Sequence, residues 1–226
     1  MNGETMAVRV WDLPTRTFHW VLAVCVFCSL GSAWIGGNAM VWHLRFGTLV
    51  FALVLFRLLW GFLGGRWSRF TSFAYAPATS LRYLRGQSRR DEWHDVGHSP
   101  LGSWSVFALL GILALQVACG LFADDEIATT GPLNKFVSGK TATLLTRWHT
   151  TAGQWAIIAL IVLHVGAVLF YLLRQRKNLI GPMVSGDKAL AADVPGSIDT
   201  PASRLMALAL FVTVGGLVLW LVSLGD

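Results

Sequence analysis

The sequence predicts an all-α integral membrane protein, a bundle of transmembrane helices. Of its 226 residues, 54% are hydrophobic and only 13% are charged, whereas soluble domains carry about 25% charged residues. The apolar residues occur in long runs that short charged patches separate, which is typical of a chain that crosses a bilayer several times. This composition largely excludes the soluble enzyme classes.

Five apolar stretches are long enough, or nearly so, to span a membrane, since a helix needs about 20 residues to cross a hydrocarbon core of about 30 Å. Arg57 interrupts the second stretch and His164 the fourth. In the connection between the second and third stretches, Pro77 is expected to begin a short helix. The expected spans are residues 18–35, 46–62, 101–123, 155–173 and 205–224.

The net charge of +6 follows the expected topology of the chain. Three alternate segments, residues 1–17, 63–100 and 174–204, hold 13 of the 18 basic residues. By the positive-inside rule, the N-terminus of this multi-pass chain is cytoplasmic and the C-terminus, after an odd number of spans, lies outside. We therefore expect lipid, and no nucleic acid, around this chain. The 13 residues are Arg9, Arg16, Arg66, Arg69, Arg82, Arg85, Arg89, Arg90, Arg174, Arg176, Lys177, Lys188 and Arg204.

Four of the six histidines lie in the spans or at their ends, where an ionisable residue is costly and suggests a function. The predicted topology places His19 near the inner surface, and it places His43 and His149 at the outer surface. His164 follows His149 by 15 residues, which sets it roughly 22 Å deeper in a helix and on nearly the same face. The sequence therefore predicts two histidines at each of two depths.

Two neutral imidazoles that face each other across a helical bundle can serve as the axial ligands of a haem iron. The predicted pairs are His19 with His164 and His43 with His149. No Cys-x-x-Cys-His motif is present, so the haem would be bound non-covalently as haem b, two per chain. Zinc is the rival metal, but it usually needs three or four ligands close together. A transporter that relays protons or metal ions through these histidines is a further alternative, although the spans contain no Asp or Glu.

The pattern Trp-His-x-x-x-Gly occurs twice, with the glycines at Gly47 and Gly153. A glycine four residues after a histidine lies on the same helical face and leaves room for a porphyrin, although glycine is also common in membrane helices for close packing. Haem propionates need cationic partners. The candidates are Arg45 and Arg147 on the outer side and Arg16 and Arg57 on the inner side, although Arg57 could equally extend to the inner interface.

Taken together, these segments resemble the prokaryotic cytochrome b561 family, which includes the cytochrome b subunits of membrane-bound nickel-iron hydrogenases. The resemblance covers roughly residues 8–175. It implies a four-helix bundle with two b haems, with His19, His43, His149 and His164 as ligands. The matching segments are residues 10–20 (VWDLPTRTFHW), 43–47, 56–62 (FRLLWGF), 97–102 (GHSPLG), 148–149 and His164.

We accordingly expect a di-haem core over residues 1–175, a mobile cytoplasmic linker over 176–204 and an additional C-terminal transmembrane helix over 205–226. The resemblance implies a location in the bacterial inner membrane, with the C-terminus periplasmic, and electron transfer between ubiquinone or menaquinone and a periplasmic partner such as a c-type cytochrome. The alternative is the haem b anchor subunit of a periplasmic hydrogenase or dehydrogenase that passes electrons to quinone.

Overall fold

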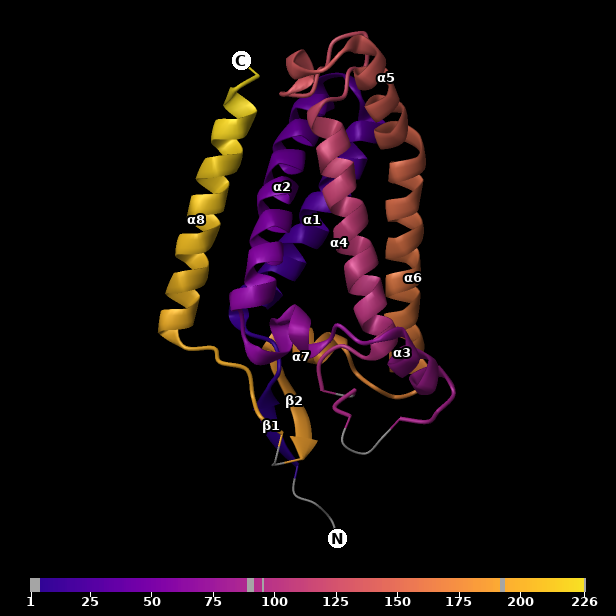
Figure 1. Cartoon of the computed structure of the whole chain (residues 1–226), viewed down its shortest axis with the longest axis vertical. Helices are drawn as coiled ribbons and strands as arrows, with labels where there is room; N and C mark the ends of the chain where they lie inside the picture. The colour runs from indigo at the N-terminus through magenta and orange to yellow at the C-terminus, as the bar shows by residue number, and fades with distance from the viewer. Residues whose placement is uncertain (1–4, 89–91, 95, 192–193, 226) are drawn as a thin grey trace. The chain divides into compact units, whose positions relative to one another are not determined.

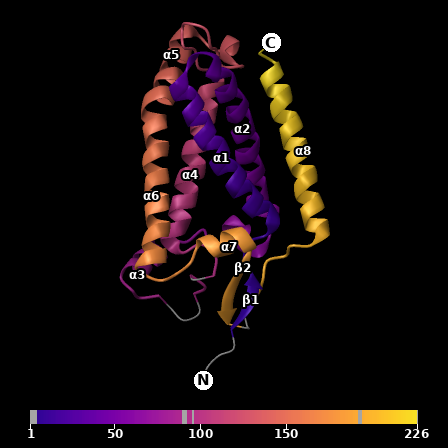
Figure 2. The same cartoon turned by 180° about the vertical axis from the view of Figure 1, so that it is seen from behind.

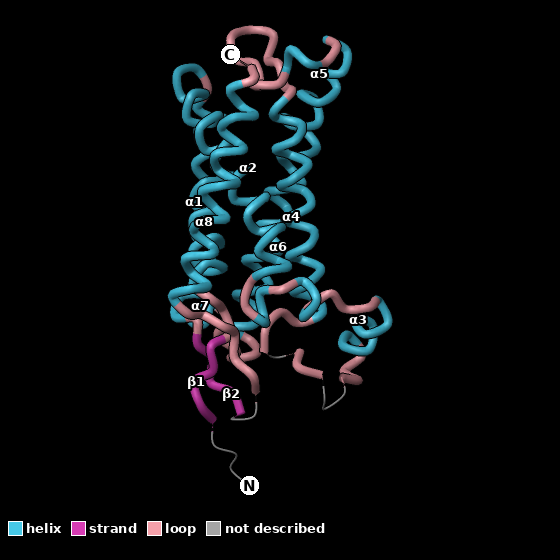
Figure 3. The backbone as a smooth tube through the Cα atoms, turned by 60° about the vertical axis from the view of Figure 1, so that its left-hand side comes forward, coloured by secondary structure: helices cyan, strands magenta, loops and turns pink. Residues whose placement is uncertain are grey.

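In a computed structural model that describes residues 5–88, 92–94, 96–191 and 194–225, each of the five predicted spans is a long helix (Figures 1 and 3). All five lie in helical segments long and apolar enough to cross a membrane. The predicted helical membrane bundle is thus confirmed. The five helices are α1 (Leu13–Ile35), α2 (Met40–Leu63), α4 (Pro100–Leu121), α6 (Gln154–Leu173) and α8 (Pro201–Ser223).

Proline opens several of the helices because its fixed φ suits the first turn, where a missing N–H costs nothing. The predicted helix at Pro77 is present as α3 (Pro77–Leu84), and α4 and α8 begin at Pro100 and Pro201. The remaining short elements are the 3-10 turns η1 (Gly37–Ala39), η2 (Arg66–Ser68), η3 (Phe70–Ser72) and η4 (Asn134–Phe136), and the helix α7 (Ile180–Ser185).

The fourth span begins earlier than its apolar run predicts. Helix α5 (Gly139–Arg147) leads through a π-helical turn, η5 (Trp148–Gly153), directly into α6. The Ser138 side chain caps α5 by accepting a hydrogen bond from the Thr141 amide at 3.3 Å. The apolar pattern did not show α5 because this segment is polar on one side.

The chain forms two compact units. Unit 1 comprises Met1–Thr17, Arg57–Ala108 and Leu163–Ala207, and it contains the three connections that carry the 13 basic residues, of which Arg89 and Arg90 lie outside the described residues. Unit 2 comprises Phe18–Phe56, Leu109–Val162 and Leu208–Asp226. The three basic connections therefore lie in one unit, as expected for a chain that crosses a membrane five times.

Part of the expected linker pairs with the N-terminus in unit 1. Strand β1 (Thr5–Arg9) lies beside β2 (Asp187–Ala191) (Figure 2). The two strands pair antiparallel, with Arg9 opposite Asp187. The expected mobile linker thus contains a helix, α7, and a strand, β2. The sequence did not predict this pairing, because nothing in either short segment indicates a partner so far away in the chain.

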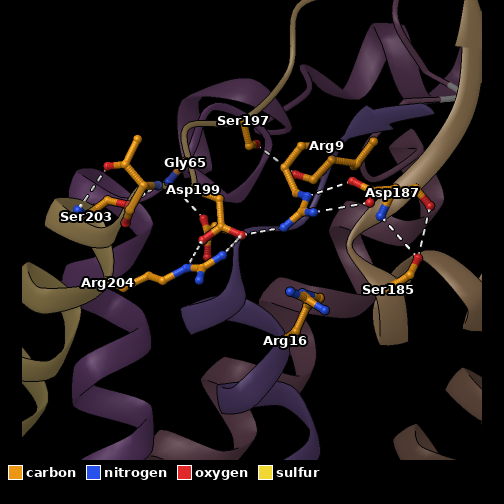
Figure 4. A network of polar contacts seen from close by, with 12 residues as sticks. Arg9, Arg16, Gly65, Ser185, Asp187, Ser197, Asp199, Ser203 and Arg204 are labelled. Carbon is orange, nitrogen blue, oxygen red and sulfur yellow. Dashed lines mark hydrogen bonds and ion pairs between the residues drawn. The ribbon is translucent and has the colours of Figure 1, made fainter. Parts of the chain in front are cut away.

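A polar network joins these strands to the beginning of α8 (Figure 4). Arg9 forms an ion pair with Asp187 at 2.6 Å and one with Asp199 at 2.5 Å. Asp199, whose side chain is 3% exposed, also accepts two hydrogen bonds from Arg204, at 2.8 and 3.0 Å. The Arg204 guanidinium and the Arg9 side chain hold the pKa of Asp199 down, at about 2.

This lowered pKa predicts a pH-dependent contribution of Asp199 to stability. A depressed carboxyl pKa stabilises the fold fully above the ordinary value of 3.8, and the effect is lost as the pH falls through about 2. We expect Asp199→Asn to lower the unfolding temperature in detergent at neutral pH, with the difference from wild type shrinking between pH 4 and 2. Glu126→Gln is the control, because Glu126 is exposed in the acidic loop. A constant difference across this range would contradict the prediction.

In unit 2, α8 packs against α2. Val214 and Val218 of α8 are buried against Ala52 of α2, and the rings of Phe56 and Phe211 meet edge to face with 5.8 Å between their centres. The additional fifth helix is therefore packed against a core helix in this unit.

Candidate functional site

Two of the predicted ligand histidines face each other in unit 2. His43 lies in the first turn of α2, and His149 lies in the π turn η5. Their ring centres are 5.8 Å apart, and the ring planes stand at 83°. A ring centre lies about 3 Å from a metal that its nitrogen binds, so two rings that share one metal atom are about 6 Å apart. The observed separation fits a pair of axial ligands.

Both rings are oriented by backbone carbonyls of neighbouring helices. His43 Nδ1 is 2.9 Å from the Ser29 carbonyl oxygen of α1, and His149 Nδ1 is 2.9 Å from the Gln116 carbonyl oxygen of α4. A carbonyl only accepts, so each ring carries its proton on Nδ1 and presents the lone pair of Nε2. Metal-bound histidines usually donate their other ring N–H to a carbonyl or carboxylate in this way.

The His149 ring lies directly against α4 at Gly120. A Cβ atom built on Gly120 would be 2.8 Å from Cε1 and 3.1 Å from Nδ1 of His149, so any larger residue would displace the ring. Gly120 was not among the residues predicted from the sequence. A small residue one helical turn after the polar Gln116 was the available signal.

Gln116 is a second residue near His149 that was not predicted from the sequence. Its Nε2 donates a hydrogen bond to the His149 carbonyl oxygen at 2.7 Å. An amide inside an otherwise apolar span is the signal that could have found it, because such a group is costly without a partner.

The two predicted glycines differ in their surroundings. A Cβ built on Gly47 meets no described atom within 4 Å, which is consistent with room for a flat ring beside His43. A Cβ built on Gly153 would overlap the Gln116 carboxamide. Gly153 therefore makes room for a protein side chain, and its proximity to a porphyrin stays a prediction.

A comparison with known families identifies the family of the chain. The model of the family described as prokaryotic cytochrome b561 matches residues 10–186, most of the chain. The chain belongs to this family. The resemblance seen in the sequence is confirmed, and this cytochrome is a haem b protein that transfers electrons in a membrane.

Several curated relatives of this cytochrome carry the name "Probable Ni/Fe-hydrogenase B-type cytochrome subunit". The relative from Cupriavidus necator is 27% identical and aligns with 82% of this chain and 88% of its own length. The one from Rhodobacter capsulatus is 25% identical, with 83% of each chain aligned. The Escherichia coli (strain K12) protein, named as the hydrogenase 1 subunit, is 21% identical over 82% of this chain and 92% of its own length.

The second predicted pair involves both units of the cytochrome. His19 lies on α1 in unit 2, where its ring stands edge-on to Trp20 at 4.9 Å. His164 lies on α6 in unit 1. Their role as a ligand pair therefore stays a prediction from the sequence.

The four predicted arginines fall into two groups. Arg45 is exposed and stacks on Trp42 at 4.8 Å, and Arg147 is exposed at the end of α5. Each lies two residues from a predicted ligand histidine. In unit 1, Arg57 is 3% exposed, donates to the Ser68 carbonyl at 3.0 Å and lies over Phe70. Arg16 donates to the Val184 carbonyl at 2.5 Å. The two exposed arginines are thus the more accessible candidates for haem propionates.

Proposed function

We propose that this cytochrome holds two haem b groups and carries electrons between the quinone pool and a periplasmic redox protein. His43 and His149 hold one haem, and His19 and His164 hold the other. The facing imidazoles of His43 and His149, each oriented through Nδ1, are the observation that carries the proposal.

The protein residues supply ligation, orientation and a low-dielectric setting. Bound haem supplies a reversible one-electron couple. His43 and His149 bind through Nε2, and the carbonyls of Ser29 and Gln116 keep their Nδ1 protons in place. A bond from Nδ1–H raises the basicity of the imidazole and so favours the ferric state.

The proposed orientation follows from charge. The basic connections face the cytoplasm under the positive-inside rule. His43 and His149 each lie at the start of a span that returns from the opposite side, so this pair belongs to the periplasmic side of the inner membrane. Residues 124–126 are acidic, and the Asp124 amide donates to Thr146 Oγ1 at 2.8 Å, which ties this loop to α5. The loop is suited to steering a basic partner toward the same side.

The names of the relatives indicate which partner to test first. The relatives are named as probable Ni/Fe-hydrogenase subunits. We therefore propose a periplasmic nickel-iron hydrogenase as the electron donor and ubiquinone or menaquinone as the acceptor. A c-type cytochrome is the second candidate, with electrons flowing from quinol.

The cofactor proposal is tested by haem content. We expect the purified protein to contain two haem b groups per chain in a pyridine haemochrome assay, because the sequence supplies two depth-matched histidine pairs and no covalent attachment motif. A content near one haem per chain would mean that only one of the two histidine pairs binds haem. A content near zero would refute the haem assignment.

The partner proposal is tested by rapid mixing. We expect a co-purifying hydrogenase with H₂ to reduce the haems, and added quinone to reoxidise them. Reduction by quinol followed by salt-sensitive oxidation by a c-type cytochrome would instead favour the second partner, because screening weakens steering by the acidic loop.

A further inference from the structure

Gln116 is attached to His149 at two points. Its side-chain Nε2 donates to the His149 carbonyl at 2.7 Å, and its own carbonyl accepts from His149 Nδ1 at 2.9 Å. The opposite orientation of the amide would set two oxygens against each other, so the direction of the first bond is determined. The backbone and the ring of His149 are therefore both bonded to α4.

The side-chain bond is made where the helix is irregular. His149 lies in the π turn Trp148–Gly153, and such turns are rare and are frequently found at functional sites. A π turn departs from the regular ladder of α-helical hydrogen bonds, so a donor from outside the helix helps to hold it. Gln116 supplies this donor to the carbonyl of the ligand residue itself.

Two glycines permit this arrangement. Gly120 lets the His149 ring lie against α4, and Gly153 lets the Gln116 carboxamide approach the π turn. A side chain at Gly120 would collide with the His149 ring, and one at Gly153 would collide with the Gln116 carboxamide. The ring, the amide and both backbones are thus in close contact.

We propose that Gln116 is the positioning residue of the His149 ligand and that it lowers the reduction potential of the haem held by His43 and His149. The inference rests on the proposed function. By holding the π turn against α4, the amide keeps the bond from Nδ1–H to the Gln116 carbonyl short. That bond makes the imidazole a stronger donor and stabilises the ferric state.

The test compares Gln116→Met, which keeps the length of the side chain but loses the donor, with Gly153→Ala, which pushes the amide away. Leu115→Met is the matched control, since Leu115 is the exposed neighbour on α4. We expect both test variants to keep two haems, to raise the midpoint potential of one haem and to change its low-spin EPR signal. The double variant is expected to show no more than the larger single effect, because both changes break one contact.

Three results would overturn the inference. Gln116→Met could match Leu115→Met in potential and EPR signal. The effects of Gln116→Met and Gly153→Ala could add, which would mean that Gly153 acts separately, for example by clearing space for the porphyrin. The potential could also fall. A wild-type protein without haem would refute the proposed function itself. If the wild type does bind haem, the three results above refute only the Gln116 proposal.

Discussion

Replacing His43 or His149 by alanine is expected to remove the same haem and to reduce the content from two per chain to one. The two rings lie with 5.8 Å between their centres, so either substitution would remove one of the two imidazoles that would hold this haem. Redox titration and pyridine haemochrome analysis of each variant measure the loss. His19→Ala and His164→Ala are expected to remove the other component.

Thr150→Ala is the control for this comparison. Thr150 is exposed beside His149, and its hydroxyl bonds only to the Thr146 carbonyl among the contacts described. It should keep both haems. Loss of one component in His43→Ala and of the other in His149→Ala would contradict the pairing.

Replacing Asp12 by alanine is expected to lower the stability of the fold more than the Asp199 substitution does. Asp12 is completely buried in unit 1. Its carboxylate accepts hydrogen bonds from the Thr15 amide at 2.8 Å, the Gly65 amide at 2.9 Å and Trp60 Nε1 at 3.2 Å. Without it, three buried donors lose their acceptor, at about 1–3 kcal/mol each.

The unfolding temperature in detergent measures this effect, with tryptophan fluorescence as the signal. Asp12→Asn keeps one acceptor oxygen and should recover part of the loss. Glu126→Ala is the control, because Glu126 is exposed in the acidic loop. An Asp12→Ala protein as stable as the control would show that these three bonds contribute little to the fold.

The helices were predictable because their cause is local. A run of about 20 apolar residues is sufficient to favour a spanning helix, and Pro77 marked the start of α3 by its own backbone chemistry. Helix α5 and the π turn were not predictable, since residues 139–153 are polar enough to read as a loop. Strand β2 was missed because its only strand partner, among the residues described, is β1 at the other end of the chain.

The candidate site was predictable only in part. His43 and His149 stood out because ionisable residues are rare in apolar spans. Gln116 and Gly120 did not stand out, since their roles depend on their contacts with His149, which the sequence of α4 does not show.

By itself, therefore, the sequence determined the five helices, the grouping of their basic connections and the histidines available as ligands. These depend on hydrophobicity, chain length and charge, which each segment carries alone. Only the tertiary structure decided which carbonyl receives each Nδ1 proton, which glycine admits the His149 ring and which strand closes the linker. Those features are contacts between residues far apart in the chain, and they exist only after the helices have packed.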